Sequence, residues 1–183
     1  MNHLTNLHYK TYYASAQYVS YLLTPATVSL AIPLYLQLER LKKNFVSIII
    51  SLIAGAITSM GSILAMALLF HIGHKDYVTM LSKSITTAIG MGVSKELHGV
   101  VTITVAVIIV TGILGIVFAE FILKLFRIKD PVAKGLAIGA SSHAIGTSKA
   151  MEMGEIEGAM SSLAIVVSGL LTVVGASVFA QFY

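Results

Sequence analysis

Long apolar runs alternate along the chain with irregular segments that mix small, polar and apolar residues. The apolar runs cover residues 45–70, 100–126 and 156–183. Each run reaches the roughly 20 residues that an α-helix needs to cross a bilayer. The pattern therefore predicts an all-α, polytopic membrane protein that forms one transmembrane domain over residues 1–183.

The three irregular segments cover residues 12–37, 80–99 and 135–154. The first contains two prolines, and the other two are rich in glycine and hydroxyl residues. A broken helix exposes backbone groups that lipid cannot satisfy, so such segments belong against protein or beside a wet cavity. We therefore expect discontinuous helices. If the second and third segments are re-entrant and return to the side from which they came, the basic clusters at residues 40–43 and 124–134 share one side of the membrane, whereas full crossing would place them on opposite sides. Because basic residues gather on the cytoplasmic side, we expect the re-entrant arrangement.

The irregular segments also resemble one another. The sequence "AIP" at residues 31–33 corresponds to "AIG" at residues 88–90 and 144–146, and a glutamate stands seven residues after each isoleucine. Repeats and broken helices are common in secondary transporters. With re-entrant segments, successive copies have opposite orientations, so we predict an inverted internal repeat.

Composition and charge fit this picture. Only 11% of the residues are charged and 56% are hydrophobic, whereas a soluble domain carries about a quarter charged residues. The net charge of +4 does not indicate nucleic acid binding, because the basic residues cluster at the ends of apolar runs, as in cytoplasmic loops. We therefore expect most of the protein surface to face the lipid bilayer.

Enzyme signatures are absent from the sequence. The chain has no cysteine, which excludes thiol catalysis and thiolate metal sites. Nucleophile-elbow, phosphate-loop and zinc-protease motifs do not occur either. We therefore expect no enzymatic activity, no cofactor and no metal.

The second irregular segment carries Lys83, Ser84, Thr86 and Thr87 just before Gly90. A lysine and hydroxyls beside a broken helix can bind a carboxylate, and exposed amides at a half-helix N-terminus add positive potential. The alternative is that the lysine extends to the headgroups and the threonines bond to their own helix.

The third irregular segment offers a parallel set of polar groups between close-packing glycines. Its candidate binding residues are Ser142, His143, Thr147 and Lys149. Gly139 and Gly146, like Gly90 in the second segment, are expected to set the breaks in the helix. An ionisable residue at membrane depth is a functional candidate, and a histidine can bind an anion or relay a proton. The alternative is a histidine that is hydrogen-bonded within a tight contact between helices.

The first irregular segment contains Pro25, Thr27 and Pro33. Either the prolines break the helix and the hydroxyl contributes to a site, or they only kink it.

Three stretches together resemble the LrgB/CidB family: "LLTPATVSLAIPLY", "KSITTAIGMGVSKELHG" and "DPVAKGLAIGASSHAIGTSKAMEMGEIEGAMSSLAI". The resemblance extends from about Tyr9 to the end of the chain. It implies a multi-pass protein of the bacterial inner membrane that acts as an antiholin-like or holin-like regulator of murein hydrolases and cell lysis. It also implies a small membrane partner of the LrgA/CidA type.

The same resemblance implies transport of small monocarboxylates such as pyruvate, lactate and glycolate, because relatives are linked to pyruvate uptake and a plastid relative carries glycolate and glycerate. Substrate contacts are then expected from the candidates of the second and third segments, and a homo-oligomer is expected. The rival interpretation is a holin-like pore or lysis regulator without a substrate site, assembled through the small-residue faces "TGILG" and "SGLLTVVG".

Two departures from the family pattern stand out. Family members typically have more helices before the "PATV" stretch, so we expect this chain to be a short form or a fragment of a longer protein. The family often has proline where this sequence has Ser82 and Ala88, which predicts a less sharply broken second segment.

Overall fold

The computed structural model describes Pro25 and residues 31–183, which form helices and connecting loops with no β-strand among them. Three helices are long and apolar enough to cross a membrane: α5 (Phe45–Phe70), α8 (Val101–Leu125) and α10 (Glu155–Phe179). A helix of this length rises about 38 Å, which exceeds a hydrocarbon core of about 30 Å. The three predicted spans are confirmed, and the chain is an all-α membrane protein.

The second irregular segment forms a helical hairpin. Its legs are α6 (His74–Met80) and α7 (Thr87–Glu96), joined by the non-helical residues 81–86. The Thr104 hydroxyl on α8 lies 2.9 Å from the Thr79 carbonyl oxygen of α6 and 2.7 Å from Ser94 Oγ of α7. Both legs therefore lie side by side against α8, and neither is long enough to span a bilayer.

The third irregular segment also folds back on itself, within α9 (Pro131–Met153). The helix is interrupted at His143, whose φ of 45° and ψ of −142° are non-helical. The backbone of Gly139, before the break, lies against the Ser161 carbonyl oxygen of α10. Thr147, after the break, lies 2.7 Å from the Ser161 hydroxyl. Because positions on both sides of His143 meet the same residue of α10, α9 is a hairpin with two short legs.

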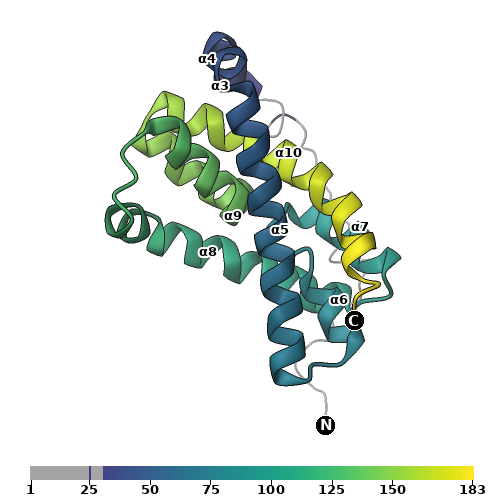
Figure 1. Cartoon of the computed structure of the whole chain (residues 1–183). Coiled ribbons are helices and arrows are strands. Elements are labelled where there is room, and N and C mark those ends of the chain that lie inside the picture. The colour runs from purple at the N-terminus through teal and green to yellow at the C-terminus, as the bar shows by residue number, and fades with distance from the viewer. Residues whose placement is uncertain (1–24, 26–30) are drawn as a thin grey trace, which may run out of the picture.

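The two hairpins pack at opposite ends of the spanning helices. The α6–α7 hairpin shares a core with the second half of α5, including Met60 and Ala67. The first leg of α9 instead packs, through Leu136, on Ile48 and Leu52 near the start of α5. Figure 1 shows α6, α7 and the C-terminus of the chain gathered at one end of the molecule. The hairpins thus enter from opposite ends, as re-entrant segments of inverted copies should.

The element order agrees with the predicted internal repeat. A short helical segment precedes each span: α3 (Ala31–Leu36) and α4 (Leu38–Lys43) precede α5, α7 precedes α8, and the second leg of α9 precedes α10. The three spans run in alternating directions because each hairpin returns to its own end. The basic ends of α4 and α8 therefore fall on one side.

The glycines predicted to break the helices lie elsewhere than at the breaks. Gly90 is inside α7, and Gly139 and Gly146 are inside the legs of α9. A Cβ at Gly90 would collide with the Ile108 side chain of α8. These glycines permit close helix packing, whereas the backbone breaks are at residues 81–86 and at His143.

The proline-containing segment is described only in part. Pro33 lies within α3, and a turn at Gln37 separates α3 from α4. Thr27 lies outside the described residues. Pro25 is described and exposed, but its neighbours on both sides are not, so the predicted break at this position stays a prediction.

Candidate functional site

A cavity of about 770 Å³ lies between α5, α8, the first leg of α9 and the connection of the α6–α7 hairpin. This volume is within the range of about 300–1,000 Å³ that is usual for small-molecule sites. Its wall contains one lysine, several hydroxyl groups and many apolar side chains, and no aspartate or glutamate among the described lining residues. The hydroxyl residues are Ser51, Thr58, Ser59, Ser62, Ser84, Thr111, Ser141 and Ser142.

Lys83 supplies the positive charge of this cavity. Its ammonium donates to Ser84 Oγ at 3.2 Å and to Ser59 Oγ at 3.4 Å, and the two hydroxyls are 3.0 Å apart. Lys83 belongs to the non-helical connection, and Ser59 lies in the middle of α5. Within the described part of the chain Lys83 takes part in no ion pair. The cavity therefore holds a cation whose protein partners are neutral.

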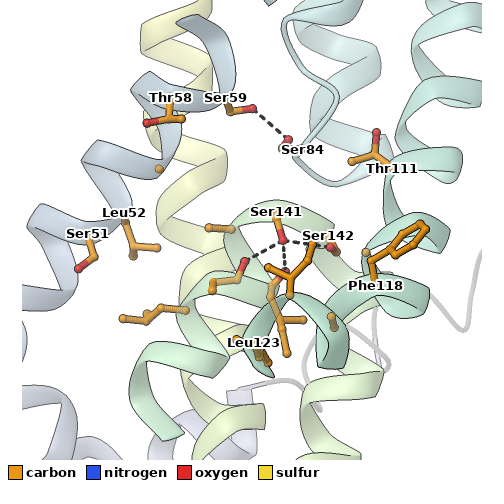
Figure 2. Close-up of a pocket in the computed structure, with 18 of the residues that line it drawn as sticks. Ser51, Leu52, Thr58, Ser59, Ser84, Thr111, Phe118, Leu123, Ser141 and Ser142 are labelled. Carbon is orange, nitrogen blue, oxygen red and sulfur yellow. Dashed lines mark hydrogen bonds between the residues drawn. The ribbon is translucent and has the colours of Figure 1, made fainter. Parts of the chain in front are cut away.

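Ser141 and Ser142 face the same space from the tip of the α9 hairpin. Their hydroxyls are 3.1 Å apart, and Figure 2 shows them across the cavity from Ser59 and Ser84. Phe118 and Leu123 of α8 give the adjoining apolar wall. The arrangement offers a cation and hydroxyl donors at one end and apolar surface at the other, which suits a small organic anion.

His143 and Thr147 do not line the cavity. His143 is 3% exposed, and its Nε2 lies 3.0 Å from the Ile108 carbonyl oxygen of α8. The Thr147 hydroxyl donates to the His143 carbonyl oxygen at 3.0 Å and also contacts Ser161 of α10. The two side chains thus connect the break in α9 to both neighbouring spans, α8 and α10. The hydrogen bond of His143 agrees with the alternative interpretation, in which this histidine is bonded within a tight contact between helices.

His143 allows a direct test of the break. His143→Ala removes the hydrogen bond to Ile108 and keeps a Cβ at a backbone angle that favours glycine, so we expect a loss of about 1–3 kcal/mol in unfolding free energy. His143→Gly removes the same bond but relieves the backbone, so it should be about 1 kcal/mol more stable than the alanine variant. Thermal unfolding in detergent gives the order. The reverse order would contradict a left-handed backbone at this position.

The remaining predicted residues lie outside the cavity. Lys149 pairs with Glu120 of α8 at 2.9 Å and with Glu152 at 3.4 Å. Thr86 is the residue before α7 and Thr87 is its first residue, and both are half-buried. The structure therefore brings together Lys83, Ser84 and Ser142 and separates them from the other candidates.

Sequence reasoning missed the contribution of α5. Ser51, Ser59 and Ser62 line the cavity from this helix, although it reads as a plain apolar span. The clue is in the sequence: hydroxyl residues at 47, 51, 58 and 62 recur at helical spacing on an otherwise apolar helix. A polar stripe of this kind indicates a face directed toward something other than lipid.

The two small-residue faces considered for assembly of a pore are partly used inside the chain. Gly112 and Gly115 of α8 lie against the α9 hairpin at His143 and Ser142. Gly169 and Gly175 of α10 approach Ile89 and Met60. These glycines therefore serve packing within one chain.

The donor groups of the cavity suit an anion better than a metal ion. Within the described residues, histidine, aspartate and glutamate side chains nowhere form a group of three or more that could hold a metal ion. The polar groups of the cavity are one ammonium and several hydroxyls, which bind anions better than cations.

Spanning helices, re-entrant hairpins of opposite orientation and a polar cavity define a membrane protein of the inverted-repeat type. The chain belongs to the LrgB-like family, whose sequence pattern matches residues 1–182. It is 39% identical over 173 residues to "Antiholin-like protein LrgB" of Bacillus subtilis (strain 168), covering 94% of this chain and 75% of that protein. The protein of the same name from Bacillus mycoides (strain KBAB4) is 36% identical over 177 residues, which cover 97% of this chain and 77% of that protein. No solved structure matches the chain.

Proposed function

We propose that this protein carries small monocarboxylates, of the pyruvate, lactate and glycolate class, across the bacterial inner membrane. The observation that carries the proposal is the Lys83 ammonium, which faces a cavity without any carboxylate among its described lining residues. A charge removed from water is costly unless it is paired. A carboxylate bound beside Lys83 would supply the missing charge, and the hydroxyls of Ser59, Ser84 and Ser142 would bond its 2-oxo or 2-hydroxy group.

The arrangement of the two hairpins supports a mechanism in which they move relative to each other around the Lys83 cavity. Lys83 lies at the tip of one hairpin and Ser142 at the tip of the other, so both hairpins reach the cavity from opposite ends. In transporters built from inverted repeats, the substrate binds where such discontinuous helices meet, and one repeat moves against the other. We infer a multi-pass topology with the basic ends of α4 and α8 in the cytoplasm.

The name shared by the relatives favours a second role. Both are called antiholin-like proteins, so we propose that this protein also influences murein hydrolase activity and cell lysis. We propose that it acts as a homo-oligomer and that its partner is a small membrane protein of the LrgA/CidA type. A pore without a substrate site is the competing mechanism.

Purified protein in vesicles separates the two mechanisms. We expect saturable uptake of labelled pyruvate, competition by lactate and glycolate, and full retention of a trapped fluorescent dye much larger than pyruvate. A carrier binds each substrate molecule in a cavity of limited size, so it saturates and excludes the dye. Dye release together with non-saturable pyruvate entry would overturn the carrier proposal in favour of a pore.

A further inference from the structure

A second cavity, of about 500 Å³, lies at the basic end of the chain and shares only Leu123 with the Lys83 cavity. It is bounded by the last turn of α8, the loop before α9, the first turn of α9 and Met153. Ile128, Met153 and Leu123 form its apolar wall. The charged lining residues are Glu120, Lys124, Arg127, Lys129 and Lys134.

The charges of this cavity do not balance. Glu120 is already paired with Lys149 at 2.9 Å and with Lys124 at 3.5 Å. Lys134 lies 3.9 Å from Glu157. Among the ion pairs of the described residues, none includes Arg127 or Lys129. The cavity therefore presents two unpaired cations in addition to those that share carboxylates.

Arg127 holds an unusual backbone position. Its φ is 53°, and the turn that ends α8 is closed by hydrogen bonds from Arg127 N to the Lys124 carbonyl at 3.1 Å and from Ile128 N to the Leu123 carbonyl at 2.9 Å. This is the geometry of a helix end at which glycine is the usual residue. A side chain is disfavoured there, although His71 and His98 close helix ends at similar angles in this chain. The case for the guanidinium therefore rests on its place in the wall of the cavity and its lack of a carboxylate partner.

We propose that this second cavity binds the phosphate of an anionic phospholipid headgroup. Guanidinium and phosphate match as bidentate partners, and basic pockets at the membrane surface recognise such headgroups. The cavity lies at the end of a spanning helix, where a headgroup would be. Phe121, Leu125 and Phe126 beside it are exposed on and just after α8, and they provide an apolar track for the acyl chains. Figure 1 shows a loop running from this end of α8 to the start of α9.

Native mass spectrometry of the full chain in detergent tests the site. We expect phosphatidylglycerol to bind more tightly than phosphatidylcholine, and the double variant Arg127→Gln/Lys129→Gln to weaken phosphatidylglycerol binding about tenfold to thirtyfold. The matched control is Lys42→Gln/Lys43→Gln, which removes two exposed cations near the start of α5 and should change binding less than about twofold. Equal losses in both double variants would overturn the proposal, because they would show attraction to charge without a site.

Two further arms identify the ligand and guard against misfolding. Inorganic phosphate at the same concentration should not displace phosphatidylglycerol, since it has no acyl chains to contact α8; displacement would assign the cavity to a free anion instead. Arg127→Gly should raise the unfolding temperature, because glycine fits the turn, while it weakens lipid binding. Unchanged lipid binding in this stable variant would refute a role for the guanidinium. The inference does not depend on transport through the Lys83 cavity.

Discussion

Replacing Lys83 with methionine is expected to abolish measurable pyruvate uptake. The substitution keeps an unbranched side chain of similar length and removes the charge. A carboxylate bound in the cavity would then lose its only cation among the described lining residues. Truncating one partner of a buried charge pair costs about 2–5 kcal/mol, which corresponds to a loss of affinity between about thirtyfold and about four-thousandfold. Uptake into vesicles and binding of pyruvate in detergent should both report this loss.

The matched control for this prediction is Lys95→Met. Lys95 lies in the last turn of α7, in the same hairpin, but is exposed and does not line the cavity. Its replacement removes the same charge from the same element, so it should leave uptake within about twofold of the unmodified protein. Lys83→Arg keeps the charge and should retain part of the binding. If Lys83→Met and Lys95→Met transport equally, the anion does not bind at Lys83.

The spanning helices were predictable because lipid imposes a simple rule. A long apolar run has to form a helix when no water is present to satisfy its backbone, and α5 covers residues 45–70 as the pattern predicts. The re-entrant hairpins were predictable for the opposite reason, since their hydroxyls and glycines are unsuited to lipid. Charge then fixed the expectation that each hairpin returns to its own side.

The positions of the breaks were not predictable in the same way. Glycine serves both for unusual backbone angles and for close packing, and sequence does not distinguish these uses. In this chain Gly146 packs within a hairpin, while His143 takes the left-handed backbone angle. The histidine tolerates this position because its ring and its carbonyl are both hydrogen-bonded.

The candidate site was predictable in part. Lys83 and Ser84 stood out because a polar cluster in a membrane segment is expensive without a role. Their partner Ser59 lies on another helix, 24 residues before Lys83, and the contact depends on how the hairpin tip meets α5. Sequence spacing carries no information on that packing. The polar pair of His143 and Thr147 looked equally functional, yet both side chains find partners within the protein.

The largest effect on folding is expected at Gly139. A Cβ at this position would collide with the Ser161 carbonyl oxygen and would lie 2.8 Å from Ala164 Cβ. The first obstacle is the backbone of α10, a spanning helix, and cannot rotate away as a side chain would. Gly139→Ala therefore has to separate the α9 hairpin from α10, with a cost of about 3 kcal/mol or more. We expect a large fall in the unfolding temperature and aggregation in size-exclusion chromatography.

Gly61→Ala is the matched control for Gly139→Ala, because it makes the same substitution at a helical glycine with free space around it. Gly61 lies inside α5, and a Cβ added there would meet no heavy atom within 4 Å, so alanine should stabilise the helix by about 0.5–1 kcal/mol. The same chemical change should thus have opposite signs at two helical glycines of one chain. The difference arises because one glycine brings two helices together and the other only loosens its own helix. If both variants unfold at the same temperature, α9 does not pack against α10 through Gly139, and the re-entrant hairpin would have to be abandoned.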